Sequence, residues 1–148
     1  MLKWLNDSSV KAALNVPAAA SYFLIDNGVQ IIDLSTPSAP VAVASATDGG
    51  SDGSGGTFDK LNGARGVATF VIGASTYAIV ASFGVDHGVP IMDLSTPSSP
   101  VAVASASNGV NGFLLDDPRD IATFTIGGSP YAIVASYGDN GVQIIDLS

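Results

Sequence analysis

The chain has 148 residues, with 13 acidic residues against five basic ones and a formal net charge of −8. A nucleic-acid partner is excluded on this balance, because neutralising phosphates requires a positive surface, and an anionic membrane would repel the chain as well. Cysteine is absent, which excludes disulfides and thiol sites. Every acid is aspartate and good helix formers are scarce, so the composition favours an all-β fold.

Residues 1–20 differ from the rest of the chain and are predicted to form a divergent N-terminal segment. They contain no apolar stretch long enough for a secretion signal. The stretch VKAALNV at 10–16 is a candidate for a degenerate first strand.

From residue 21 onward the chain repeats itself with a period of about 53 residues. The segment Gly28–Gly49 returns at Gly88–Gly109, and its beginning returns again at Gly141–Ser148. A second repeated segment starts at Arg65 and at Arg119. The surplus between the first two copies falls in one glycine-rich insertion, which we interpret as a loop. The predicted units are 21–63, 64–117 and 118–148.

Each unit is predicted to contain four short antiparallel strands. In the middle unit we expect them at Val67–Ile72, Tyr77–Phe83, Val89–Leu94 and Val101–Ser107, and in the last unit the first two at Ile121–Ile126 and Tyr131–Tyr137. Asn27 and Asn140 each precede a glycine, a dipeptide that tolerates the positive φ of a tight turn. Four sequential strands at a fixed period are typical of a β-propeller blade, so we predict about three such blades.

A stretch without charge runs from Gly66 to Val85 and is long enough to resemble a membrane span. The turn sequence GAST interrupts it, and its repeat carries Gly127, Gly128 and Pro130. We therefore expect two strands of a hairpin and no membrane insertion.

Three units cannot close a ring, since the smallest propellers have four blades, or about 210 residues at this period. The last unit also lacks its fourth strand, which predicts an exposed sheet edge. We expect that edge to be covered by another chain in a homo-oligomer or by further repeats of a longer chain. In a third interpretation, residues 10–15 serve as the missing outer strand of the last unit.

The sequence YAIVASYGDNGVQIIDLS, followed in earlier copies by STPSAPVAVASA and GARGVATFVI, resembles the LVIVD repeat. The resemblance covers about residues 22–148 and is most specific in the DLSTPSxP segment. It implies a β-propeller of a secreted or surface-attached prokaryotic protein, so we expect an extracellular or cell-surface location. The long loop before the first strand and residues 1–20 depart from the family pattern, and the resemblance implies no catalytic residue.

Acidic loops provide a candidate calcium site, since calcium takes several carboxylate and carbonyl oxygens from flexible loops. The spacing lacks the ladder and closing glutamate of an EF-hand, and the alternative is a solvated flexible loop. The candidate metal ligands are Asp48, Asp52 and Asp59 in the insertion, and Asp116 and Asp117, followed by Asp120, in its shorter counterpart.

The loops between the second and third strands are expected to open on the same rim as the loops before the first strand. Asp26, Asp86, His87 and Asp139 are therefore candidate ligand-binding residues, with the alternative that His87 is simply a turn residue. A lone histidine argues against a histidine metal centre or a Ser–His–Asp triad.

Arg65 and Arg119 recur at the start of the first strand and are candidates for holding an anionic or acidic ligand group. The alternative is an ion pair with a neighbouring aspartate. Two further recurring sets are interpreted as structural. The aspartates that end the third strand accept turn N–H bonds, and the tyrosines that start the second strand are packing residues, with a stacking platform as the alternative. They are Asp33, Asp93 and Asp146, and Tyr22, Tyr77 and Tyr131.

From these patterns we expect a non-catalytic interaction or assembly module, which binds a protein or glycan ligand through its loops or its exposed edge strands. One alternative is a metal-dependent enzyme that uses the acidic rim of a closed ring, although no acid recurs with a base or nucleophile at a catalytic spacing. Another is a filament subunit whose free edge pairs with the next chain.

Overall fold

The computed structural model describes residues 13–14, 20–21, 27–85 and 87–148. In these ranges the regular elements are β-strands in four antiparallel sheets, apart from one short 3₁₀ turn, η1, at Val110–Gly112. The all-β prediction is therefore confirmed. None of the described segments forms a helix with the length and apolar character needed to span a bilayer.

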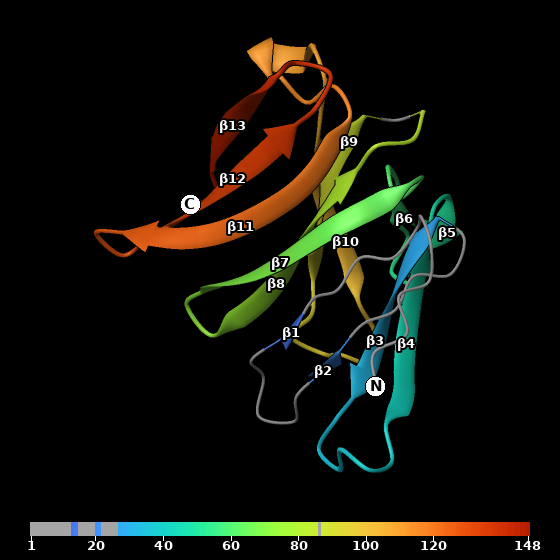
Figure 1. Ribbon diagram of the computed structural model, residues 1–148. Coiled ribbons are helices and arrows are strands. Elements are labelled where there is room, and N and C mark those ends of the chain that lie inside the picture. The colour runs from blue at the N-terminus through green and yellow to red at the C-terminus, as the bar shows by residue number, and fades with distance from the viewer. Residues whose placement is uncertain (1–12, 15–19, 22–26, 86) are drawn as a thin grey trace.

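Three of the sheets are meanders, in which strands that follow one another in the chain are also neighbours (Figure 1). The first sheet contains β1 (Ala13–Leu14), β2 (Ala20–Ser21), β3 (Gly28–Asp33) and β4 (Val41–Thr47). The second contains β7 (Ala64–Ile72), β8 (Ser75–Ser82), β9 (Gly88–Asp93) and β10 (Val101–Ser107). The third contains β11 (Pro118–Ile126), β12 (Ser129–Ser136) and β13 (Gly141–Asp146).

The strand predictions agree with these bounds to within two residues, except at the start of the first strands. Both β7 and β11 begin three residues earlier than expected, and each has a register shift against its partner there, between Ala64 and Gly66 and between Pro118 and Asp120. The uncharged stretch from Gly66 forms the β7–β8 hairpin, as predicted. The positive φ expected before glycine is present at 63° in Asn27 and 54° in Asn140.

The pairing of β1 distinguishes between the two interpretations of residues 10–16, as a first strand of the first unit or as an outer strand of the last unit. Ala13 and Leu14 pair with Ser21 and Ala20 of β2, and β2 pairs with β3. The described part of the 10–16 candidate is thus the first strand of the first sheet, as one prediction had it. The reading that used it as the outer strand of the last unit is wrong for these two residues; the remainder of 10–16 lies outside the described residues.

The glycine-rich insertion between the first two sheets has structure of its own. It forms a two-stranded sheet from β5 (Gly50–Ser51) and β6 (Thr57–Phe58). Phe58 and Leu61 are buried in the core, and Asp52 is only 8% exposed. The expectation of a solvated flexible loop is therefore wrong here, because two apolar side chains anchor this segment to the protein.

Two apolar cores join the three sheets, one on each face of the second sheet. The first core packs Val29 and Ile31 of β3 against residues such as Val80 of β8. The second packs Ile79 of β8 against residues such as Val134 of β12. The second sheet thus lies between the other two (Figure 1).

The first strands of neighbouring sheets approach each other closely. β7 and β11 run side by side (Figure 1), and the Thr123 hydroxyl donates a hydrogen bond to the Thr69 carbonyl over 2.7 Å. A Cβ added to Gly66 would lie 2.8 Å from the Cα of Asp120. Only glycine allows this backbone approach.

Candidate functional site

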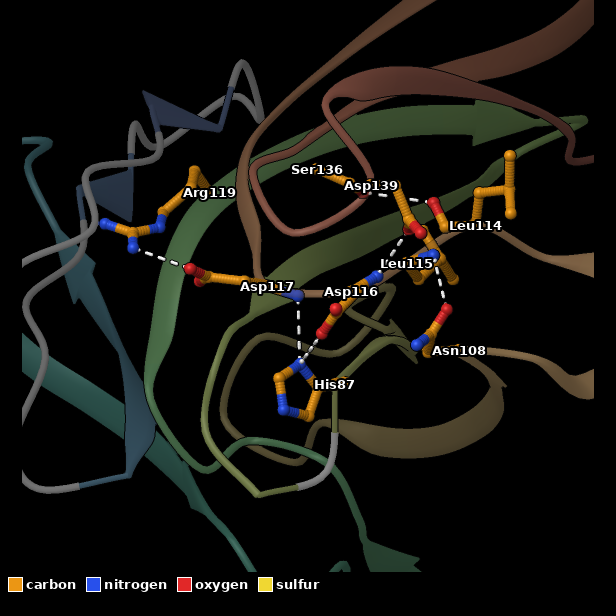
Figure 2. Close-up of polar contacts among 9 residues, drawn as sticks. All are labelled: His87, Asn108, Leu114, Leu115, Asp116, Asp117, Arg119, Ser136 and Asp139. Carbon is orange, nitrogen blue, oxygen red and sulfur yellow. Dashed lines mark hydrogen bonds and ion pairs between the residues drawn. The ribbon is translucent and has the colours of Figure 1, made fainter.

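Loops from different units meet at one end of the second and third sheets, as predicted for the rim (Figure 2). We call His87, Asp116, Asp117, Arg119 and Asp139 the polar rim. His87 lies between β8 and β9, Asp139 between β12 and β13, and the other three at or just before the start of β11. Asp26 and Asp86, also predicted for this rim, lie outside the described residues.

His87 ties the loop of the second sheet to the loop before the third. Its Nδ1 accepts the N–H of Asp117 over 2.9 Å and lies 3.0 Å from Oδ1 of Asp116. While Nδ1 accepts, the proton of a neutral imidazole is on Nε2. An ion pair with Asp116 instead requires a proton on Nδ1. In that state Nδ1 can no longer accept the N–H of Asp117.

The backbone of His87 explains why it is a turn residue, the alternative considered for it. Its φ is 35°, and it occupies the position that Asn27 and Asn140 occupy in the other units. The side chain has an equivalent role too, because Asn27 Oδ1 accepts the N–H of Gly63 over 3.2 Å. Gly63 is the repeat counterpart of Asp117. The same connection between loops is therefore made by asparagine in one unit and by histidine in the next.

Asp139 and Asp117 each use one carboxylate oxygen in a contact with protein groups, and Oδ1 of Asp117 is buried without a hydrogen-bond partner. Asp139 Oδ2 accepts the N–H of Asp116 over 2.8 Å, and Arg119 forms an ion pair with Asp117 over 2.6 Å (Figure 2). This pair is the alternative considered for Arg119. Nearby, the Ser136 hydroxyl donates to the carbonyl of Leu114 over 3.1 Å.

Both recurring arginines gather around an aromatic ring that the sequence patterns did not single out. The Arg65 guanidinium lies 3.9 Å from the centroid of Phe83, and that of Arg119 lies 5.7 Å from it. Arg119 also lies 4.9 Å from the centroid of Tyr137, the repeat counterpart of Phe83. A recurring aromatic residue just before Gly84 and Gly138 was the available signal, and cation–π contact accounts for it.

The acids proposed as calcium ligands are not assembled into one site. No group of three metal-ligating side chains occurs among the described residues. Asp52 accepts N–H bonds from Ser54, Gly56 and Ala102, at 2.8, 2.8 and 3.1 Å. Asp59 is exposed. Calcium binding stays a prediction, and Asp52 would have to give up backbone partners for it.

Asp48 has a structural role that does not depend on its charge. Its Oδ1 accepts the N–H of Leu61 over 2.9 Å. In the next unit the amide of Asn108 accepts the N–H of Leu115, the counterpart of Leu61, over 3.0 Å (Figure 2). A neutral side chain thus makes the same loop connection.

The aspartates that end the third strands cap the following turns, as predicted. Asp33, Asp93 and Asp146 accept the N–H of the serine two residues later, at 2.7, 2.7 and 2.9 Å. The N–H of Ser35 lowers the pKa of Asp33, and the N–H of Ser148 lowers that of Asp146. Tyr77 stacks on Phe70 and packs against the second core, which agrees with a packing role. Tyr131 stacks on Phe124 and is half-buried. Tyr22 lies outside the described residues.

The third sheet contains the feature that most clearly separates it from the other two. Among the strands that the structure describes, its last strand, β13, pairs with β12 alone, whereas β3 pairs with β2 and β4. Both strands have the sequence GVQIID. In contrast, the edge of the second sheet is partly capped, since the Asp52 carboxylate accepts the Ala102 N–H of β10. β13 therefore presents an open edge, as β4 does at the end of the first sheet.

No protein-family model matches the chain, and no curated protein matches it significantly.

Proposed function

We propose that the protein is a non-catalytic interaction and assembly module, built from three propeller-type units and working at a cell surface or in an extracellular structure. The sheet order supports the propeller arrangement, because each sheet is a meander packed on the next and the first strands lie side by side. The likeness of the repeats to LVIVD units supports the location. The polar rim supports a non-catalytic role, since Asp139 accepts a backbone N–H and Asp117 pairs with Arg119.

The observation that carries this proposal is the open edge of β13. In the first sheet, β4 covers the same GVQIID sequence in a defined register, with Gly28 opposite Thr47 and Asp33 opposite Val41. An extended segment added to β13 in that register would gain main-chain hydrogen bonds along a ready-made edge. This is strand addition, a general mode of peptide recognition.

A synthetic peptide with the sequence of residues 36–49, TPSAPVAVASATDG, tests the proposal. We expect the chain to bind it, and to bind a scrambled peptide of the same composition much more weakly. Titration calorimetry or fluorescence anisotropy measures both. Equal binding of the two peptides, or none, would contradict strand addition.

Gly141→Ala provides a matched variant of the chain. A Cβ at Gly28 would collide with the Ala46 carbonyl of β4, whereas a Cβ at Gly141 meets nothing closer than 3.7 Å. The substitution should therefore leave the fold intact and still prevent a strand from pairing at that position. Loss of peptide binding with an unchanged circular dichroism spectrum is the expected result.

A further inference from the structure

The third sheet has one covered face and one bare face. Residues directly opposite each other on paired strands share a face, so two rows can be read from the register. Val134 and Gln143 pair on the covered face, where Ile121, Ala132, Val134 and Ile145 join the second core. Ala135 pairs with Val142 and Ile133 with Ile144 on the bare face. Val142 is 62% exposed and Ile144 is 56% exposed.

In the second sheet, the equivalent face is covered by the third sheet. By the repeat, Ile133, Ala135 and Val142 correspond to Ile79, Ala81 and Val89. Those three residues of the second sheet are at most 1% exposed. They are buried in the core that the second sheet shares with the third. The equivalent side chains are thus buried where another sheet follows, whereas on the third sheet Ala135 and Val142 are exposed and Ile133 is half-buried.

The first sheet gives the same comparison with an identical strand sequence. Val29 and Ile31 of β3 are 6% and 5% exposed, because they pack against the second sheet. Their counterparts in β13 are the exposed Val142 and Ile144. Removing two such aliphatic side chains from water favours association. This face is therefore built for burial.

The bare face is apolar between two acids. Its central rows contain Ala122, Phe124, Tyr131, Ile133, Ala135, Val142 and Ile144, with the rings of Phe124 and Tyr131 stacked at 5.6 Å. Asp120 lies opposite Ala135 at one end, and Asp146 lies opposite Tyr131 at the other. Exposed apolar surface with a polar boundary is typical of a protein interaction site.

The complementary surface is at the other end of the series of sheets. Ile32 and Ala42 pair on the face of the first sheet opposite to the one that packs on the second. Their counterparts in the second sheet, Met92 and Ala102, belong to or pack against the first core. Ala42 is exposed, and Ile32 is half-buried although Met92 is fully buried. The first sheet therefore presents the kind of face that packs on a preceding sheet.

From these observations we infer that the bare face of the third sheet docks the first sheet of a second copy of this chain. The contact repeats between chains the packing that joins the sheets within one chain. It is heterologous, so it closes into a ring where the rotation allows and otherwise continues as a filament. The inference depends on the proposed assembly function and specifies its surface and partner, which are distinct from the strand-pairing edge of β13.

Sedimentation velocity over a concentration series tests the inference with single substitutions at exposed positions. Ile144→Asp places a carboxylate in the docking face, and Ala42→Asp places one in the complementary face. The matched control is Val71→Asp, because Val71 is 58% exposed near the tip of the β7–β8 hairpin and away from both faces. We expect the wild type and the control to associate equally. Each interface variant should associate on the order of 100-fold more weakly, since the contact would bury an unpaired charge.

Mixing the two interface variants tests the direction of the contact. The Ile144→Asp chain keeps a functional first sheet, and the Ala42→Asp chain keeps a functional third sheet. Their mixture should therefore form a 1:1 complex that does not grow further, although each variant alone remains monomeric. A mixture that stays monomeric, or a wild type that is monomeric at every concentration, overturns the inference.

A fluorescent reporter separates this inference from strand addition at the edge. The chain has no cysteine, so Ile144→Cys can be labelled at a single position with an environment-sensitive dye. We expect a concentration-dependent blue shift there and none from a Val71→Cys control. Association without a blue shift at position 144 overturns the docking face. Binding of the residue 36–49 peptide, measured on the same Ile144→Asp chain, reports separately on the proposed function.

Discussion

At the scale of single residues, equivalent loop contacts are made by different side chains in different units. Asn27 and His87 both accept a loop N–H, from Gly63 and Asp117. Asp48 and Asn108 do the same for two buried leucines. Because amide, imidazole and carboxylate groups replace one another, these positions require an acceptor at a fixed place and not a particular charge or reactivity.

His87→Asn should consequently be tolerated. Asparagine adopts positive φ more readily than most residues and already makes the equivalent contact at position 27. His87→Ala removes the acceptor of the Asp117 N–H and should lower the free energy of unfolding by about 1 kcal/mol. Urea denaturation of the two variants measures the difference. Equal stability of the alanine and asparagine variants would contradict an acceptor role for the imidazole.

Asp52 should make the protein sensitive to acid. The N–H of Ser54 is the main cause that lowers the pKa of this carboxyl below its ordinary value of 3.8. A lowered folded-state pKa gives stability that is complete above the unfolded-state pKa and is lost as the pH falls through the folded-state value. Asp52→Asn should therefore lower the melting temperature at pH 7, and the difference from wild type should shrink below about pH 4.

The matched control for Asp52 is Asp59→Asn, because Asp59 is exposed in the same insertion. We expect its melting temperature to follow the wild type at every pH. A constant difference between the Asp52→Asn chain and the wild type down to strongly acidic pH would show that the carboxylate charge is not the source of the effect.

At the scale of elements, the close approach of β7 and β11 should be sensitive to a single methyl group. Gly66→Ala would force the Asp120 backbone away from β7 and should destabilise the protein by about 1–3 kcal/mol. Gly141→Ala adds the same methyl group in a strand where nothing lies within 3.7 Å, and should change stability by about 0.5 kcal/mol or less. Similar unfolding midpoints for the two variants would contradict the tight packing of β7 and β11.

The strands themselves could be predicted because the repeat and the turn dipeptides mark their limits. β10 agrees with its predicted bounds, and the Asn–Gly turns have the expected positive φ. The early start of β7 and β11 could not be predicted, since Arg65–Gly66 and Pro118–Asp120 contain poor strand formers. These residues are held in the sheet by pairing across a register shift, which local sequence does not encode.

For the candidate site, the sequence predicted which loops meet at the rim. It did not predict which backbone N–H groups bond to the acidic side chains and to His87. The meeting of the loops followed from the four-strand pattern, and the aspartate caps followed from the position of these residues beside the turns. The bonds from Asp52 to Ala102 and from Asp117 to His87 join segments 50 and 30 residues apart. Such contacts depend on how the sheets pack, so a cluster of acids in the sequence was not sufficient to define a metal site.

At the scale of the whole molecule, the repeat explains why the surfaces differ between otherwise similar sheets. Each sheet carries one face for the preceding sheet and one for the following sheet, and only the second sheet has both buried among the described residues. The proposed contact between copies would therefore involve the exposed faces of the first and third sheets.

Appending a second copy of residues 36–49 after Ser148 should complete the third sheet. The fusion reproduces the natural junction between DLS and TPSAP, and it supplies the segment that forms β4 beside an identical strand. New strand pairing offsets the ordering of the added residues, and we expect a net gain of about 1 kcal/mol, or about 3 °C in melting temperature. The fusion should also no longer bind the free peptide, while a fusion to the scrambled sequence should keep the wild-type melting temperature and bind it normally. A completed edge that still binds peptide would place the recognition site elsewhere than β13.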